Sequence, residues 1–192
     1  MEDSIIIDSI FNIEEIKNSN LEEIIFMNRN ITIHDINILN TVKKLKKIYF
    51  IDTKIEYLNE LNLDIKSLYF DNCNIEEIID INKFNLKELF LENQHEIDLN
   101  DINIIRNIET LSFTNTKIIN EEKLIFMDKI IYLDLFNTRI TDLSILINME
   151  YLKVLVIDEE LAKSNKEIIK QLIEKGIKVV NDSNQSVVIY FE

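Results

Sequence analysis

Proline is absent from this chain of 192 residues, and glycine and cysteine each occur once. With one glycine, the chain can form neither the glycine-rich phosphate loop of nucleotide hydrolases nor a dinucleotide-binding fingerprint. The lone Cys73 cannot form an internal disulfide, and we expect it to have a structural role. No apolar run approaches the roughly 18 residues of a transmembrane helix, so no membrane-spanning segment is expected.

Groups that carry metal or catalytic chemistry are equally scarce. The two histidine–acid neighbours, His34-Asp35 and His95-Glu96, lack a second His or Cys at ligand spacing, so a zinc site is not expected. No serine lies in a nucleophile elbow. The sequence therefore predicts a protein that is not an enzyme, with no catalytic residues, no metal and no cofactor.

The charge is strongly of one sign, with a formal net charge of −14. Binding to nucleic-acid phosphates needs a concentrated positive surface, so we expect no nucleic-acid partner. The acidity fits a basic protein partner as well as it fits solubility alone. The start, MEDSIIID, is acidic where a signal peptide is basic, and we therefore expect a cytoplasmic monomer with no membrane attachment.

The sequence is rich in one repeated pattern, apolar-x-x-apolar-x-apolar-x-x-(Thr/Cys/Asn)-x-Ile. The fourth pattern position recurs at intervals of 24, 20, 21, 22, 22 and 19 residues. Periods of about 20 to 29 residues are typical of leucine-rich repeats. The chain is thus expected to be one domain over 1–192, with an N-terminal cap (1–20), about seven repeats (21–157) and a C-terminal cap (158–192). The copies begin at Leu21, Leu45, Ile65, Leu86, Ile108, Ile130 and Met149.

Each copy predicts a short β-strand, because positions 4 and 6 alternate with position 5 as the two faces of a strand do. Positions 4 and 6 are apolar and should lie inside, which buries Phe26, Phe50, Phe70 and Phe113. A strand this short cannot bury its apolar face alone, so each should pair in parallel with the strand of the next repeat. The strand centres are predicted near residues 24–26, 48–50, 68–70, 89–91, 111–113, 133–135 and 152–154.

The remaining positions of the repeat have expected structural roles. A small polar residue at position 9 can hydrogen-bond the backbone of the turn after the strand, and Arg29 departs from this in an atypical first repeat. Asn or Asp at position 8 should form a ladder that hydrogen-bonds along itself. The return segments, with apolar residues about every third position, predict short 3₁₀ turns. Position 9 is occupied by Thr53, Cys73, Gln94, Thr116 and Thr138.

Both ends read as caps. Ile5 and Ile7 predict a strand that aligns Ile5 with Ile24, followed by a short helical stretch. Near the other end, Ser164 and Glu167 form a capping-box pattern that predicts a helix ending at Gly176. Two further strands are expected, over 177–180 and 187–191.

One stretch carries a family resemblance. The run NTRITDLSILINMEYL, from Asn137 to Leu152, closely resembles the 22-residue repeat of bacterial internalins and their eukaryotic relatives. The resemblance implies an α/β fold: a right-handed leucine-rich repeat solenoid with a concave parallel β-sheet and short 3₁₀ or irregular convex segments. With the helix and strands predicted for the C-terminal cap, this completes the expected fold. The family's concave sheet is expected to bind another macromolecule.

The outward positions 5 and 7 of the strands are the candidate binding surface. Tyr and Phe side chains exposed on a rigid sheet are the kind that dominate interface energy. They could also stack across the strands for stability alone. The sequence predicts a non-catalytic protein–protein interaction module; the alternatives are an effector or enzyme-regulating subunit that acts through a partner's catalytic domain, or a self-associating structural protein. The candidate partner-binding residues are Ile25, Met27, Tyr49, Ile51, Tyr69, Asp71, Phe90 and Glu92.

Overall fold

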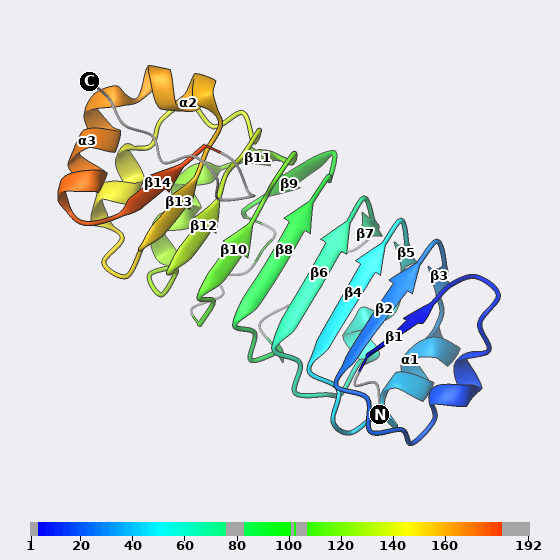
Figure 1. The fold of residues 1–192 in the computed structure, drawn as a ribbon. Helices are drawn as coiled ribbons and strands as arrows, with labels where there is room; N and C mark the ends of the chain where they lie inside the picture. Colours follow the sequence, from blue (N-terminus) through cyan, green and yellow to red (C-terminus); the bar gives the residue numbers. More distant parts are fainter. Residues whose placement is uncertain (1–3, 76–82, 101, 103–106, 182–192) are drawn as a thin grey trace. The chain divides into compact units, whose positions relative to one another are not determined.

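The computed structural model of the protein describes residues 4–75, 83–100, 102 and 107–181 (Figure 1). They fall in two compact units, Met1–Glu88 and Leu89–Glu192, each built from the same repeated strand. That all 192 residues form one domain stays a prediction. The last strand expected in the C-terminal cap, 187–191, lies outside the described residues.

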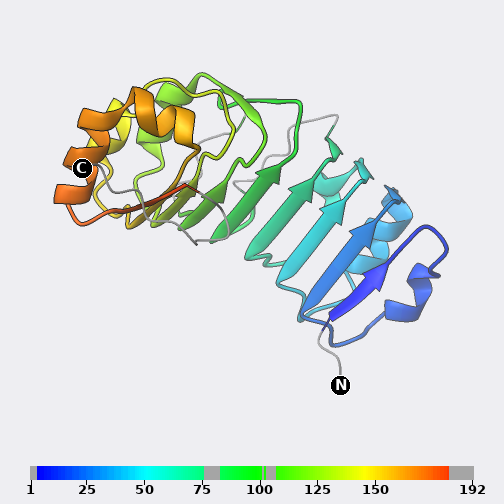
Figure 2. The same cartoon turned by 45° about the horizontal axis from the view of Figure 1, so that its top comes forward.

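The first unit is a stack of parallel strands that lie side by side in both views (Figure 1 and Figure 2). Ile5 aligns with Ile24, Ile24 with Ile48, and Ile48 with Leu68, so the predicted repeat register is confirmed here. The predicted cap strand is confirmed by the first of these pairs. In order, the strands are β1 (Ser4–Ile7), β2 (Glu23–Met27), β4 (Lys47–Ile51) and β6 (Ser67–Asp71).

After each strand of this unit the chain turns into a second, smaller parallel sheet made of β3 (Asn30–Ile31), β5 (Lys54–Ile55) and β7 (Asn74–Ile75). The return segment at Leu58–Glu60 is a 3₁₀ helix, as predicted. The short helical stretch expected in the N-terminal cap is the 3₁₀ helix Ile13–Ile16. The return of the first full repeat differs, because it is the α-helix α1 (Ile33–Leu39). Its 24-residue period leaves room for the extra turns, and Thr32 and Asp35 form a capping box at its start.

The second unit repeats the plan. Its strands are consecutive neighbours in one parallel sheet. In order, they are β8 (Glu88–Glu92, whose first residue closes the first unit), β10 (Thr110–Ser112), β12 (Tyr132–Asp134), β13 (Val154–Val156) and β14 (Lys178–Val180). Two short strands follow β8 and β10 in the chain and pair with each other in parallel: β9 (Glu96–Asp98) and β11 (Lys117–Ile119). The return segments include 3₁₀ helices at Glu121–Phe126 and Ser144–Asn148. The helices α2 (Glu159–Ser164) and α3 (Lys166–Glu174) follow β13, and α3 packs against β14.

The predicted register of the last repeat is wrong by three residues. β13 covers Val154–Val156, and Leu133 aligns with Leu155 instead of with Leu152. Leu155 was expected to face outward but is fully buried. The error has a physical source: Met149 caps the preceding 3₁₀ helix as Met127 does one repeat earlier, so an apolar residue at that point belongs to the turn and not to the strand.

The start of the predicted cap helix is also wrong. Ser164 ends α2, where its hydroxyl donates to the carbonyl oxygens of Glu160 and Leu161, and it does not cap α3. The helix α2 was not predicted; Asp158 caps it by accepting from the Leu161 amide at 2.8 Å. The predicted stop at Gly176 is confirmed: its φ is +86°, and the amides of Gly176 and Ile177 bond back to α3 as in a Schellman motif.

The core forms from the inward positions. Phe26, Phe50, Phe70 and Phe113 are all buried as predicted, with at most 1% of their surface exposed. The Phe50 ring stacks on Phe26 at 5.5 Å and on Phe70 at 5.4 Å between centroids. One aromatic column therefore joins three successive repeats of the first unit.

The position-8 residues turn the chain out of each strand. All six have positive φ, between 49° and 57°, a region that Asn and Asp enter more readily than other residues with a side chain. Their side chains also form the predicted ladder within each unit: Asn72 donates to Asp52 at 2.6 Å and Asn115 to Asn93 at 2.9 Å. The residues are Asn28, Asp52, Asn72, Asn93, Asn115 and Asn137.

Arg29, the expected exception at position 9, ties the N-terminal cap to α1. Its guanidinium donates to the carbonyl oxygens of Asp8 (3.0 Å) and Phe11 (2.9 Å) and pairs with the Asp35 carboxylate at 2.6 Å. Only 16% of the Arg29 side chain and 3% of the Asp35 side chain are exposed. Burial alone would raise the pKa of Asp35, but hydrogen bonds from Thr32 and Arg29 outweigh it and hold that pKa below its ordinary value.

Truncating the aromatic column should be costly. We expect Phe50→Ala to lower the free energy of unfolding by about 3–5 kcal/mol, because it leaves a cavity between two stacked rings. Urea unfolding followed by circular dichroism measures this. Ile51→Ala, on the outward face of the same strand, is the matched control and should cost less. A loss below about 1 kcal/mol for Phe50→Ala would mean that this side chain does not pack in the core.

Removing the cation beside Asp35 should lower the free energy of unfolding by an amount that depends on pH. Arg29→Met should cost about 3–5 kcal/mol near neutral pH, because it leaves a buried carboxylate unpaired. Since the folded pKa of Asp35 is lowered, its stabilising contribution is present above the unfolded value of about 3.9 and is lost as the pH falls through the folded value. The gap between wild type and variant in urea unfolding should therefore shrink below about pH 4. Lys17→Met, which breaks an exposed pair with Glu14, is the control; an Arg29→Met gap independent of pH would contradict the assignment.

Candidate binding surface

The candidate residues of the first unit are brought together on its outward sheet face. In the pairing of β2, β4 and β6, Ile25, Tyr49 and Tyr69 form one row across the strands. Met27, Ile51 and Asp71 form the parallel row two residues further along the strands. All six side chains are partly exposed, so five apolar groups and one carboxylate share one rigid surface.

The two tyrosines are the centre of this surface. Their ring centroids lie 5.5 Å apart with an interplanar angle of 41°, within the range of favourable aromatic pairs. Burial and the nearby carboxylate of Glu23 raise the pKa of Tyr49 above its ordinary value. The neutral hydroxyl of a tyrosine can donate a hydrogen bond. Each ring therefore offers an apolar body with a polar tip.

Charged residues border the apolar rows on both sides. Glu23 and Lys47 are adjacent in register on the side where the strands begin. Asp71 ends the second row, and Asp52 stands beside it at the turn that leaves β4. The border where the strands begin thus carries one acid and one base, whereas the border where they end carries two acids. This suits a partner that places apolar side chains on the strip and basic ones beside Asp52 and Asp71.

The sequence did not identify Ile6, which belongs to the same face. β1 places Ile6 in register with Ile25, so the row continues to the end of the sheet, and 57% of Ile6 is exposed. The signal was available, because Ile5 and Ile7 were expected inside and their neighbour must then point outward. The apolar strip therefore consists of Ile6, Ile25, Met27, Tyr49, Ile51 and Tyr69.

The other two candidates, Phe90 and Glu92, belong to the second unit. Both lie on the outward face of β8 and are partly exposed. Glu92 accepts a hydrogen bond from the Ser112 hydroxyl at 2.7 Å. Together with burial and the Asp134 carboxylate, Glu92 raises the pKa of Tyr132 to about 12. Ser112 and Asp134, also at outward positions, are almost fully buried, so this face is more closed than that of the first unit.

The position-9 residues bond main-chain carbonyls as predicted, but those of Thr116 and Cys73 lie on the strand of the preceding repeat and not in the turn that was expected. Thr116 donates from its hydroxyl to the Leu91 carbonyl at 2.8 Å, and Thr138 donates to Leu135 at 2.9 Å. The Cys73 thiol donates to the Phe50 carbonyl at 3.1 Å and lies 3.5 Å from the Thr53 hydroxyl. Burial raises the pKa of the Cys73 thiol, which makes it a poor nucleophile.

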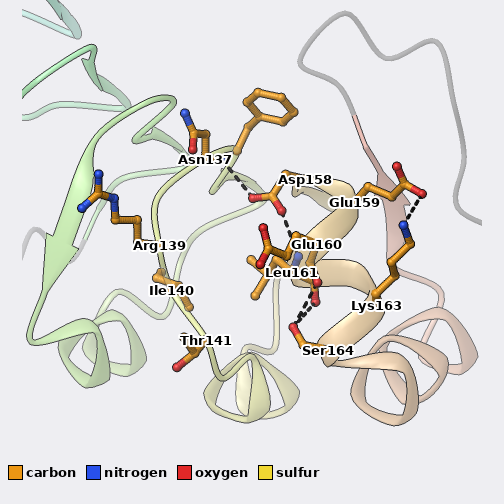
Figure 3. A pocket seen from close by; sticks show the side chains of 11 residues that line it. Asn137, Arg139, Ile140, Thr141, Asp158, Glu159, Glu160, Leu161, Lys163 and Ser164 are labelled. Atoms are coloured by element: carbon orange, nitrogen blue, oxygen red, sulfur yellow. Dashed lines mark hydrogen bonds and ion pairs between the residues drawn. The ribbon is translucent and has the colours of Figure 1, made fainter.

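The second unit also has an open cleft of about 910 Å³ beside α2 (Figure 3). Three of its charged groups already have partners in the chain: Asp158 accepts from the amides of Leu161 and Asn137, and Lys163 pairs with Glu159 at 2.7 Å. Over the described residues as a whole, no group of three His, Cys, Asp or Glu side chains could hold a metal ion.

The helices give no sign of a membrane span. Within the ranges that the structure describes, every helix is too short or too polar to cross a bilayer.

The raised pKa of Cys73 leads to a prediction about its reactivity. At neutral pH, iodoacetamide should modify Cys73 at least about tenfold more slowly in the native protein than in urea, because the thiolate is the reactive species. Native reactivity should rise only above the ordinary thiol pKa of about 8.5. Mass spectrometry of timed samples gives the rates. Cys73→Thr, which restores the commonest residue of this column, should fold normally and remain unmodified; equal native and unfolded rates would show an exposed, unperturbed thiol.

The fold is similar to that of two internalins of known structure. No protein-family profile and no curated protein matches this chain. Among solved structures, an internalin (inlF) from Listeria monocytogenes is similar with a TM-score of 0.62 and 17% identity over 88% of this chain, which spans 50% of the internalin chain. Internalin C2 from the same organism has a TM-score of 0.55 and 18% identity, covering 86% of this chain and 75% of its own. At these identities the likeness concerns the fold alone, and the chain has an internalin-like leucine-rich repeat fold.

Proposed function

We propose that this protein is a non-catalytic protein-binding module whose first unit binds a partner on its outward sheet face. The observation that supports this best is the strip of six partly exposed apolar side chains, in register on adjacent strands, centred on Tyr49 and Tyr69. Contiguous apolar patches on monomeric proteins usually mark interaction sites. The internalin-like fold is in keeping with this role.

The strip is preorganised for binding. Main-chain pairing fixes the spacing of its strands at about 4.8 Å, and the buried Phe26, Phe50 and Phe70 hold them from below. A partner would therefore order few groups on this side, which lowers the entropic cost of association. Tyr rings pay little side-chain entropy and are enriched in binding hot spots.

The bordering charges favour a partner with basic groups. Asp52 and Asp71 flank the strip, and the chain as a whole carries a net charge of −14. The same charge disfavours nucleic acid. In this proposal the protein is a cytoplasmic monomer without cofactor that regulates or recruits its partner, and any catalysis belongs to that partner. Phe90 and Glu92 belong to the second unit and are proposed as binding residues of that unit's own outward face.

The opposing explanation is that Tyr49 and Tyr69 stack only to stabilise the sheet. Cross-strand aromatic pairs contribute about 0.2–1 kcal/mol, so stacking is a real contribution. It does not account for Ile6, Ile25, Met27 and Ile51, which extend the strip beyond the aromatic pair and remain partly exposed. The two explanations differ in what happens when both rings are removed.

Replacing both rings should abolish binding and spare the fold. Tyr49→Ala with Tyr69→Ala should lower stability by no more than about 1–2 kcal/mol, since the rings point away from the core, while each ring should contribute about 2 kcal/mol or more to binding. Affinity capture from a lysate, followed by titration calorimetry with the purified partner, measures the binding. Tyr151→Ala, an exposed tyrosine outside the strip, is the matched control. Undiminished binding by the folded double variant would reject this face as the site.

A further inference from the structure

The strip ends at a strand with an open edge. β1 is the terminal strand in the sheet order, and among the described residues none pairs with it on the side away from β2. Strands in this position present main-chain donors and acceptors to solvent.

The main-chain hydrogen bonds between the strands show which groups of β1 face that edge. Residues at the even positions of the repeat, which include the inward positions 4 and 6, donate their amide to the following strand. An example is the bond from the Asn28 amide to the Ile51 carbonyl at 3.0 Å. Residues in phase with the outward positions donate to the preceding strand, as in the bond from the Lys47 amide to the Glu22 carbonyl at 3.1 Å. Because Ile6 is in register with the outward Ile25, its N–H and C=O both point to the open edge.

The edge lacks the usual protection against strand addition. Natural edge strands are commonly blunted by Lys, Pro or a bulge, whereas β1 reads Ser-Ile-Ile-Ile. Ile6 is 57% exposed, and Ile10, just beyond the strand, is 90% exposed. An extended segment placed here would gain main-chain hydrogen bonds and cover apolar side chains at the same time.

The negative charge around β1 favours a basic segment as the added strand. Residues 4–31 contain five acids and two cations. Both cations are already paired, Lys17 with Glu14 at 3.5 Å and Arg29 with Asp35 at 2.6 Å. Two copies of the chain joined at this edge would bring two acidic ends together, whereas a basic segment would complement them.

We propose that β1 accepts an extended segment of a partner protein as an added strand, with an apolar residue opposite Ile6 and basic residues at both ends, near Asp8 and Glu23. The outward side chain of the added strand would continue the apolar row that runs through Ile6 and Ile25. The edge site uses main-chain pairing and shares only Ile6 with the apolar strip, so loss of the tyrosine rings and loss of edge pairing can be tested independently.

Peptide binding tests the edge directly. The probe is the peptide Gly-Gly-Lys-Val-Tyr-Val-Lys-amide with fluorescein on its N-terminal amine, titrated with the full chain and followed by fluorescence anisotropy. Replacing both Lys by Glu should weaken binding at least about tenfold, because the peptide ends then repel Asp8 and Glu23. In an added strand only alternate amides face β1, so N-methylation of the Tyr amide and of the second Val amide should differ: one should abolish binding and the other should leave it within about twofold.

Protein variants locate the site. Ile6→Pro removes the edge-facing N–H without touching the bonds to β2, and should weaken peptide binding at least about tenfold while circular dichroism stays native. Ile6→Val keeps the amide and should bind as wild type. The Tyr49→Ala, Tyr69→Ala double variant should also bind the peptide as wild type, which separates this inference from the proposed function of the face.

Three results would overturn the proposal. One is the absence of measurable peptide binding, and another is binding that both N-methylations affect equally, which would indicate side-chain contact without strand addition. The third is a concentration-dependent dimer of the chain alone, seen by light scattering and lost in Ile6→Pro. It would assign the edge to a second copy.

Discussion

Each repeat depends on the in-register parallel pairing of its strand with the next. A strand of five residues such as β4 cannot satisfy its own main chain or bury Ile48 and Phe50 by itself. Pairing provides both, because the bond from the Asp52 amide to the Asp71 carbonyl and the stacking of Phe50 on Phe70 follow from the same alignment. A slip by one residue would exchange Phe50 with Tyr49 and turn the core outward.

The same register creates the candidate binding surface. Inward alignment of Ile24, Ile48 and Leu68 places Ile25, Tyr49 and Tyr69 side by side on the opposite face. The position-8 Asn and Asp residues then take the chain out of the strand at positive φ, so the outward rows end at polar turns. The core and the candidate site therefore lie on opposite faces of the same strands and follow from the same alternation. The apolar and aromatic residues of the candidate site are also types that favour β-strands.

Periodicity also explains what could be predicted. The strands of the first unit, the four buried phenylalanines, the Asn ladder and the cap strand at Ile5 follow from the repeat alone. Prediction fails where the repeat meets a non-repeating end. Met149 fits both the first position of a repeat and the end of the preceding 3₁₀ turn, and only the pairing of β13 with β12 decides between these two positions. Likewise, Ser164 fits a capping box, but a helix capped by Asp158 already includes it. The identity of the partner proposed for the outward strip does not follow from the period, since it depends on a second molecule.

The central claim can be tested by one NMR measurement on protein with labelled phenylalanine. The in-register pairing predicts NOEs from the Phe50 ring to both the Phe26 and the Phe70 rings, whose centroids lie 5.5 and 5.4 Å away. Tyr49 should show the corresponding contact to Tyr69 on the opposite face. NOEs from Phe50 to Tyr69 or Ile25, with none to Phe26 and Phe70, would mean that the strands pair in another register and would contradict both the core and the binding surface described above.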